Sequence, residues 1–117
     1  LSTLKDYNPV LRGFEQRMLQ ELGYALTLDH DVISGKPTDP NEDYCYEIER
    51  GPVVLDESHH NQGLHLHGKT LLDMEQGDYS SAATRQQSKA LMRYILNHKL
   101  DGQPLHTRQL LKDLQQL

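Results

Sequence analysis

Three basic residues recur at every fourth position in the last third of the chain: Arg85, Lys89 and Arg93. Residues four apart on a helix lie on one face, so these side chains would form a basic ridge. Guanidinium and ammonium groups bind the phosphates of nucleic acids or the carboxylates of an acidic peptide. Arg12 and Arg17 would add to the ridge if their helix lies beside it. The alternative is an ordinary solvated helix face, because this spacing is also common on surfaces.

Histidines form the second group that could do chemistry, with seven in the chain. His59 and His60 are adjacent, and His65 and His67 follow within a few residues. Two histidines separated by one residue on a strand point to the same side, as a pair of metal ligands must. A metal site also needs further ligands and groups that orient the imidazoles, and the sequence identifies none. A histidine-based metal-binding module is therefore an alternative to a solvated polar loop.

The residues that usually carry covalent catalysis are poorly placed here. The single cysteine, Cys45, lies in a strand-like run of Tyr and Glu residues, which would not favour its thiolate. No serine stands in a glycine elbow, and no glycine-rich loop is suited to hold a phosphate. The carboxylates around this run are most simply a solvated strand face. We therefore expect that the protein is not an enzyme.

Composition and charge set the broad class. The 117 residues suffice for one compact domain, and no run of apolar residues is long enough for a membrane span. The net charge is −5, but residues 29–57 hold nine acidic residues and two basic ones, whereas residues 81–117 hold six basic and two acidic ones. This contrast predicts a surface with two differently charged faces. The lone cysteine excludes an internal disulfide and suits a reducing compartment, so we expect a cytoplasmic protein. No secretion leader is visible, and a first residue that is Leu rather than Met suggests a fragment of a longer protein.

The first element that could position these groups is a helix over residues 8–23. Asn8 is a suitable N-cap, Pro9 fits the first helical position, and Gly23 supplies a left-handed stop. Gly13, inside the helix, is expected to mark a close contact with another helix. Apolar residues at spacings of three and four predict the buried face: Leu11, Phe14, Met18 and Leu22.

The remaining elements alternate between a small sheet and helices. Residues 44–48 and 53–55 read as a hairpin, with one more short strand expected at 64–66. Helices are expected over 70–75, from Ser80 or Ser81 to about 97, and from a cap at Thr107. The core candidates of the long helix are Ala83, Ala90, Leu91, Tyr94 and Ile95. The fold class predicted is mainly α, a helical bundle with a small β-hairpin insertion at residues 27–68, in a single domain covering 1–117.

Two segments of the chain resemble a known family. Residues 9–24, Pro-Val-Leu-Arg-Gly-Phe-Glu-Gln-Arg-Met-Leu-Gln-Glu-Leu-Gly-Tyr, resemble the opening of the C-terminal domain of RecO, a bacterial recombination and repair mediator. Residues 100–110, Leu-Asp-Gly-Gln-Pro-Leu-His-Thr-Arg-Gln-Leu, are similar to a segment nearer the end of that domain. Residues 26–29 and 34–35 fall where the family has its link into a zinc-ribbon-like insertion. The resemblance spans nearly the whole chain in the right order.

The resemblance implies a DNA repair and recombination function without covalent chemistry. RecO proteins bind single- and double-stranded DNA, anneal complementary strands and pair with RecR. They also bind the acidic C-terminal tail of single-stranded-DNA-binding protein, and with RecR they help to load RecA in the RecF pathway. The family's N-terminal OB-fold domain would be missing from this chain. A purely structural helical interaction domain is a further alternative.

The resemblance also implies site residues, position by position. Arg12 matches the family arginine of the Leu-Arg-x-Phe segment, which looks like part of the site for the acidic tail. Leu11 and Phe14 flank it and would shape an apolar pocket for the terminal Phe of the tail. Lys89 and Arg93 fall on the family's long basic helix and are assigned to the tail or to DNA.

The assignment to nucleic acid includes two more arginines. Arg85 belongs to the same ridge as Lys89 and Arg93, and Arg108 matches the arginine of the family's Pro-Leu-x-Ser/Thr-Arg segment. The alternative for Arg108 is a structural ion pair near a helix start.

The chain departs from the family at the metal ligands. Many members carry four zinc-binding cysteines in the insertion, the first two as Cys-x-x-Cys-Gly. Asp31 and Ser34 stand at these two positions, before Gly35, and Cys45 is alone. We therefore expect that the zinc site is lost and that no cofactor is bound, leaving a degenerate zinc-ribbon-like hairpin held by packing and hydrogen bonds.

Overall fold

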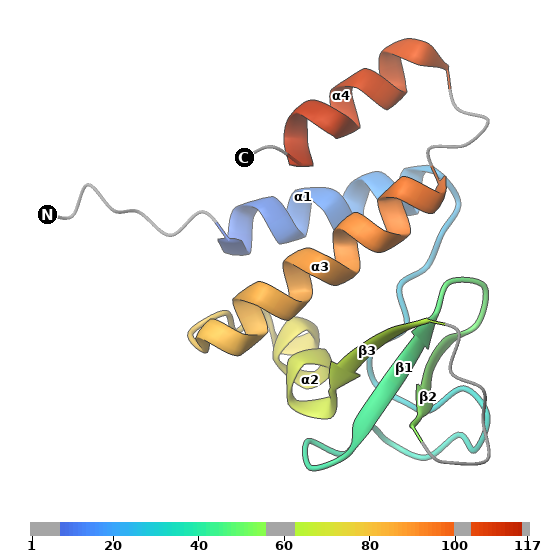
Figure 1. Ribbon diagram of the computed structural model, residues 1–117, viewed down its shortest axis with the longest axis vertical. Helices are drawn as coiled ribbons and strands as arrows, with labels where there is room; N and C mark the ends of the chain where they lie inside the picture. Colours follow the sequence, from blue (N-terminus) through green and yellow to red (C-terminus); the bar gives the residue numbers. More distant parts are fainter. Residues whose placement is uncertain (1–7, 56–62, 100–103, 116–117) are drawn as a thin grey trace, which may run out of the picture.

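A computed structural model describes residues 8–55, 63–99 and 104–115 of the chain (Figure 1). The described residues form four helices and a three-stranded sheet, which confirms a mainly α fold with a small β insertion. His59 and His60 lie outside the described residues, so the structure does not test the expectations for them. The elements in chain order are α1 (Asn8–Glu21), β1 (Asp43–Glu47), β2 (Gly51–Val54), β3 (Leu64–His67), α2 (Gly68–Gln76), α3 (Ala82–Lys99) and α4 (Leu105–Gln115).

Helix α1 spans Asn8–Glu21, close to the predicted residues 8–23, but its buried face only partly matches the prediction. Gly23, with φ of 84°, ends the helix as expected. The side chains that face the interior are Arg12, Glu15 and Leu19, whereas Phe14 is 47% exposed. Of the predicted apolar face, Met18 and Leu22 are partly buried and pack against the core, whereas the prediction for Phe14 was wrong. The buried face is therefore centred about one residue further along the helix than the apolar spacing predicted. Gly13 is not a close contact, because a Cβ there would meet nothing within 4 Å, so that expectation was wrong.

The sheet is antiparallel, in the order β2-β1-β3, with β1 in the centre. Its register pairs Tyr44 with Val54 on one side and with Leu66 on the other. Both the predicted hairpin and the additional strand are confirmed. Tyr46 is fully buried, and its hydroxyl both accepts from the Thr27 N–H at 3.1 Å and donates to the Thr27 carbonyl at 2.9 Å. These bonds tie the segment after α1 to the central strand.

The carboxylate of Asp31 organises the loop that precedes the sheet. Asp31 is buried, and one of its oxygens accepts from the N–H groups of Ile33 (2.8 Å) and Ser34 (3.2 Å). The other oxygen accepts from the N–H of Val54 in β2, at 3.3 Å. Burial raises the pKa of Asp31, but the three backbone donors together outweigh it and hold the pKa below its ordinary value. One side chain thus joins the turn to the edge of the sheet.

The turn between β1 and β2 is fastened to the end of α3. The hydroxyl of Tyr24 donates to the carbonyl of Ile48 at 2.6 Å. The ammonium of Lys99 lies 5.0 Å from the centre of the Tyr24 ring, a cation–π arrangement. Glu49 pairs with both Lys99, at 3.6 Å, and His98, at 3.2 Å. The two ion pairs of Glu49 are exposed and individually weak, yet both join the turn to the end of α3.

The hydrophobic core lies where α1, α2 and α3 meet the sheet. Leu91 and Ile95 of α3 are fully buried, as predicted, and Tyr94 packs against the core. Ala83 and Ala90 are exposed, so their assignment to the core was wrong. The buried face of α3 consists of six residues, including the two predicted ones: Thr84, Ser88, Leu91, Met92, Ile95 and Leu96.

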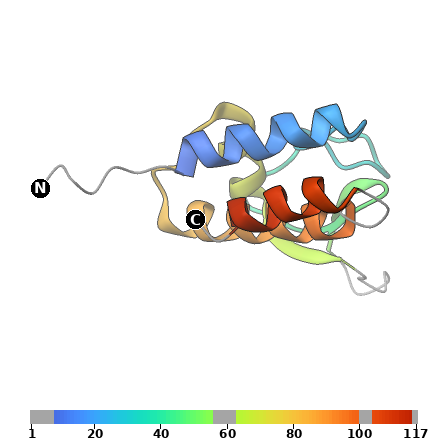
Figure 2. The same ribbon diagram turned by 90° about the horizontal axis from the view of Figure 1, so that it is seen from above.

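Helix α4 lies farthest from the sheet in Figure 1, and the view from above places it over α3 (Figure 2). It begins at Leu105, and the N–H of Arg108 donates to the carbonyl of Pro104 at 3.0 Å. The expected cap at Thr107 was therefore wrong, because the helical hydrogen bonds start at Pro104. Leu105 is 72% exposed, and Leu110 is also exposed.

Candidate functional site

The junction between α1 and α3 contains a buried ion pair. Arg12 is 3% exposed and Glu15 is 2% exposed, and the Nε of Arg12 donates to Oε1 of Glu15 one helical turn away. This i, i+3 spacing brings the two side chains together on the inner face of α1. Burial of two charges is costly unless they are paired, so each side chain fixes the other.

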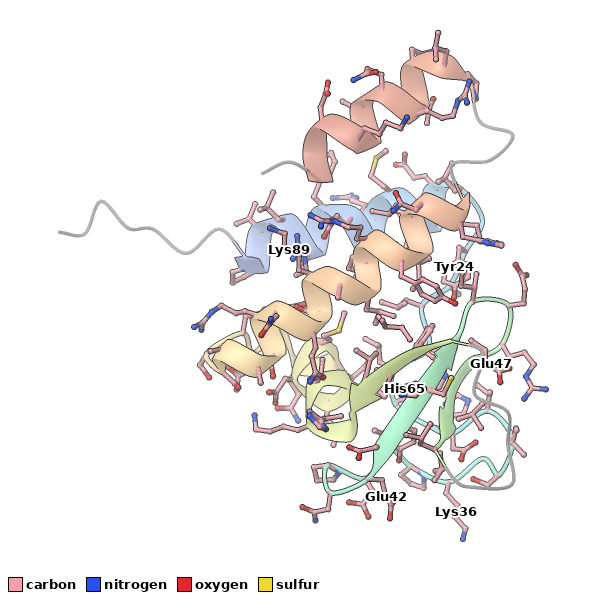
Figure 3. All side chains as sticks on the ribbon, in the orientation of Figure 1. Tyr24, Lys36, Glu42, Glu47, His65 and Lys89 are labelled. Atoms are coloured by element: carbon pink, nitrogen blue, oxygen red, sulfur yellow. The ribbon has the colours of Figure 1, made fainter. Side chains whose placement is uncertain are left out.

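Two cations of α3 face this ion pair. Burial is the strongest influence on Glu15 and raises its pKa above the ordinary value, while Arg12, Lys89 and Arg93 each draw the pKa down through their positive charges. Lys89 and Arg93 are exposed, and Figure 3 shows Lys89 where α3 passes α1. The structure therefore brings Arg12, Lys89 and Arg93 to one junction. This is the arrangement expected if the first helix lies beside the helix that carries the basic ridge.

Arg12 lies beneath this surface rather than on it. Its Nη1 is buried and has no hydrogen-bond partner among the described residues. Tyr79, from the segment before α3, is also buried; burial raises the pKa of its hydroxyl, and the charges of Arg12 and Glu15 act on it in opposite directions. An orphaned buried donor is costly, so Nη1 marks a place where an acceptor would be stabilising.

Apolar side chains lie on the outer side of α1. Val10 is 68% exposed, and Phe14 follows it by one turn of the helix. Leu11 is half-buried between the outer and inner faces. Large exposed apolar side chains that are neighbours on a helix can form a contact surface for an apolar ligand group.

The other two predicted cations are placed differently. Arg85 donates from Nη1 to the carbonyls of Tyr79 (2.9 Å) and Ser80 (2.8 Å), which holds the turn that leads into α3. Arg108 is exposed on α4. Of the three residues of the predicted ridge, Arg85 therefore already binds backbone carbonyls. Arg108 lies on α4, whereas the ridge lies on α3.

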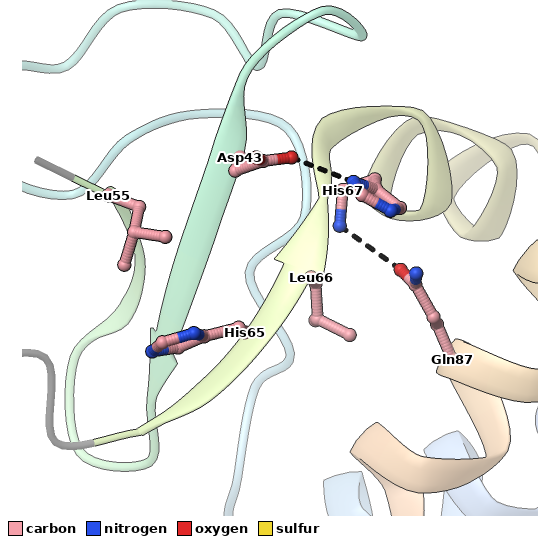
Figure 4. Close-up of a pocket in the computed structure, with 6 residues that line it drawn as sticks. All are labelled: Asp43, Leu55, His65, Leu66, His67 and Gln87. Atoms are coloured by element: carbon pink, nitrogen blue, oxygen red, sulfur yellow. Dashed lines mark hydrogen bonds and ion pairs between the residues drawn. The ribbon is translucent and has the colours of Figure 1, made fainter.

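The histidines of the sheet border a depression of about 300 Å³ (Figure 4). The Nδ1 of His67 lies 2.7 Å from a carboxylate oxygen of Asp43, and the backbone N–H of His67 donates to Gln87 at 3.1 Å. His65 stands apart from this pair in Figure 4. In the parts of the chain that the structure describes, no three His, Cys, Asp or Glu side chains are grouped so that they could hold a metal ion.

Asp31 and Ser34, which the resemblance places at two of the family's zinc-ligand positions, and the lone Cys45 do not fit a zinc ion in this structure. Both carboxylate oxygens of Asp31 accept from backbone N–H groups, and the hydroxyl of Ser34 accepts from the N–H of Lys36 at 3.2 Å. Cys45 is buried in β1. Burial raises the pKa of its thiol, and the nearby negative charge of Glu47 raises the pKa further. A cysteine binds zinc as the thiolate, and the environment of Cys45 opposes the thiolate.

Glu15 is the residue of this junction that sequence reasoning missed. Its distance of three positions from Arg12 was a usable signal, because acid–base pairs at that spacing meet on a helix. The apolar pattern of α1 instead directed attention to the neighbouring face. A second missed feature is the contact of Lys99 with Tyr24, for which the sequence holds no local signal.

Comparison with known proteins agrees with the motifs. The family described as "Recombination protein O C terminal" matches residues 1–109. The chain is 63% identical over 117 residues to the DNA repair protein RecO of Nitrosospira multiformis, covering 100% of this chain and 48% of the relative. It is 50% identical over 113 residues to that of Aromatoleum aromaticum, covering 96% and 46%. For Cupriavidus metallidurans the identity is 48% over 108 residues, covering 92% and 36%.

The chain thus spans less than half the length of these relatives. None of the helices that the structure describes is long and apolar enough to cross a membrane. The family match covers most of the sequence, and the relatives match it from end to end or nearly so. The chain therefore belongs to the RecO family, and the part of the family that it matches is the C-terminal one.

Proposed function

We propose that this chain is an adaptor part of a DNA repair and recombination mediator that acts in the bacterial cytoplasm, at the nucleoid, without covalent chemistry. Its site would bind the acidic C-terminal tail of single-stranded-DNA-binding protein at the α1–α3 junction. The observation that carries this proposal is the convergence of Lys89 and Arg93 with the buried Arg12 at that junction. Family membership supports the repair role.

The chemistry of an acidic tail suits the groups at this junction. Carboxylates of the tail would meet Lys89 and Arg93, which are exposed, while Arg12 adds positive charge from below. The terminal aromatic ring of the tail would contact the apolar side chains of α1, Leu11 and Phe14. Each charge-assisted hydrogen bond contributes about 1.5–3 kcal/mol before screening. Because the two α3 cations are exposed, affinity should fall as salt rises.

The wider functions belong to the longer protein. We propose that Arg85, Lys89, Arg93 and Arg108 add to binding of single- and double-stranded DNA, whose phosphates attract the same basic side chains. Pairing with RecR, strand annealing and loading of RecA are proposals for the whole protein, of which this chain spans less than half. A histidine-based metal site stays an untested alternative that no described feature favours.

A charge-reversal experiment tests the proposal. The double variant Lys89→Glu, Arg93→Glu should bind a fluorescent acidic peptide ending in Phe at least about tenfold more weakly, because attraction becomes repulsion at two positions. The matched control is Lys36→Glu, Arg50→Glu, which changes the net charge equally at exposed positions of the β insertion. Equal loss in both variants would mean that only the overall charge of the protein matters, and the junction would not be the site.

A further inference from the structure

The proposed tail site contains a carboxylate of its own. Glu15 is buried at the junction and accepts a hydrogen bond from Arg12, and the charges of Lys89 and Arg93 also act on it. The three cations assigned to the acidic tail therefore already stabilise one internal carboxylate. An incoming carboxylate must share them with Glu15.

We propose that Glu15 is an intramolecular competitor of the acidic tail, which lowers the affinity of the site at neutral pH and takes up a proton when the tail binds. This inference rests on the proposed function and describes how that site is regulated. It stands on the geometry of the buried Glu15 carboxylate, which is hydrogen-bonded to the buried Arg12, and on the Nη1 of the same guanidinium, which is buried without a partner among the described residues.

Proton uptake follows from the electrostatics of the junction. Burial already raises the pKa of Glu15, and Arg12, Lys89 and Arg93 oppose this rise. A bound tail would bring negative charge to these cations and would exclude water, and both changes raise the pKa of Glu15 further. The bound state then holds more protons than the free state, so affinity increases as the pH falls. Tyr79 also faces the pair, but burial raises the pKa of its hydroxyl, which stays neutral in this range.

Arg12 can keep its position when Glu15 becomes neutral. Glu15 occupies the Nε of Arg12, whereas the buried Nη1 has no partner in the described parts of the chain. A protonated glutamic acid still offers a carbonyl oxygen to Nε. The positive charge of Arg12 is then available to the ligand without loss of the hydrogen bond that orients the guanidinium.

Peptide binding at two pH values tests this competition. The probe is an acidic peptide with a C-terminal Phe and a free carboxylate, titrated into the wild type, Glu15→Gln and Glu21→Gln at about pH 7.5 and about pH 5.5, where ordinary carboxylates remain ionised. Glu21 is an exposed acid on the same helix and serves as the matched control. All three proteins carry the same histidines, so a difference between their pH responses isolates Glu15.

The expected results differ from those of a purely structural residue. Glu15→Gln should bind the peptide about tenfold more tightly at the higher pH, because one like charge is removed from the junction. It should also lose most of the pH response that the wild type and Glu21→Gln share. Weaker binding by Glu15→Gln, or an unchanged pH response, would overturn the inference while leaving tail binding in place.

Calorimetry on the wild type provides a test that needs no variant. Titrations of the same peptide near pH 6 in two buffers with different ionisation enthalpies measure the protons exchanged on binding. Net uptake is expected, and zero uptake or release would contradict the inference even if Glu15→Gln fails to fold. Absence of any peptide binding to the wild type would instead remove the proposed function, and this inference with it.

Discussion

Replacement of Asp31 should show how the β insertion is held together. The carboxylate of Asp31 accepts from three backbone N–H groups, those of Ile33, Ser34 and Val54, at distances of 2.8, 3.2 and 3.3 Å. Asp31→Asn keeps one oxygen for the two donors in the turn. It places an amide N–H₂ near the N–H of Val54, where two donors then face each other.

The expected loss of stability can be worked from these three bonds. A hydrogen bond to a charged group contributes about 1.5–3 kcal/mol, and a neutral one about 1 kcal/mol. Asp31→Asn weakens two bonds and loses the longest, so we expect the free energy of unfolding to fall by about 2 kcal/mol. Asp31→Ala leaves all three donors without this acceptor and should cost about 3 kcal/mol. Domains of this size are stabilised by only about 5–15 kcal/mol, so either loss is measurable.

Urea unfolding followed by circular dichroism measures this loss. Because the pKa of Asp31 is lowered in the folded state, its contribution is complete above the ordinary carboxylate pKa and disappears as the pH falls through the folded-state value. The wild type and Asp31→Asn should therefore converge in acid. Asp29→Asn, an exposed acid two positions away, is the matched control. If Asp31→Asn and Asp29→Asn have the same small effect at neutral pH, Asp31 does not organise the loop.

Two further predictions concern glycines and a buried hydroxyl. Gly13→Ala should raise the free energy of unfolding by about 0.5–1 kcal/mol in thermal unfolding, because a Cβ there meets nothing within 4 Å. Gly68→Ala should destabilise the protein strongly, because its Cβ would overlap the carbonyl of Asp39. Equal effects of the two substitutions would refute this contrast. Tyr46→Phe should lower the free energy of unfolding by about 1–2 kcal/mol, since both bonds to Thr27 are lost, and unchanged urea stability would contradict their importance.

The sequence predicted which helices and strands form better than it predicted which of their faces are buried. Gly23 and the alternation around Tyr44 and Tyr46 are local signals, and the structure confirms the helix end and the central strand they indicated. Thr107 was chosen as a cap by residue type, but the helical bonds begin at Pro104. Local preferences identify that a helix exists more reliably than they identify its first residue.

Tertiary packing decided what the sequence could not. Arg12 and Glu15 are polar, so no hydrophobic pattern assigns them to the interior, yet each makes the other's burial tolerable. Gly13 gave a misleading signal because a helical glycine is also compatible with an exposed position. The sequence predicted that the basic ridge and α1 would come together only if the two helices lie side by side. The packing of α1 against α3 is visible only in the structure.

The place where the acidic peptide contacts the protein decides whether the α1–α3 junction is the binding site. Nuclear magnetic resonance of ¹⁵N-labelled protein, titrated with an acidic peptide ending in Phe, locates the backbone amides that respond. If the junction binds the peptide, the largest shifts group on α1 around Glu15 and on α3 around Lys89 and Arg93, and they weaken when the terminal Phe is removed. Shifts confined to the sheet depression around His65 and His67 would contradict binding at the junction.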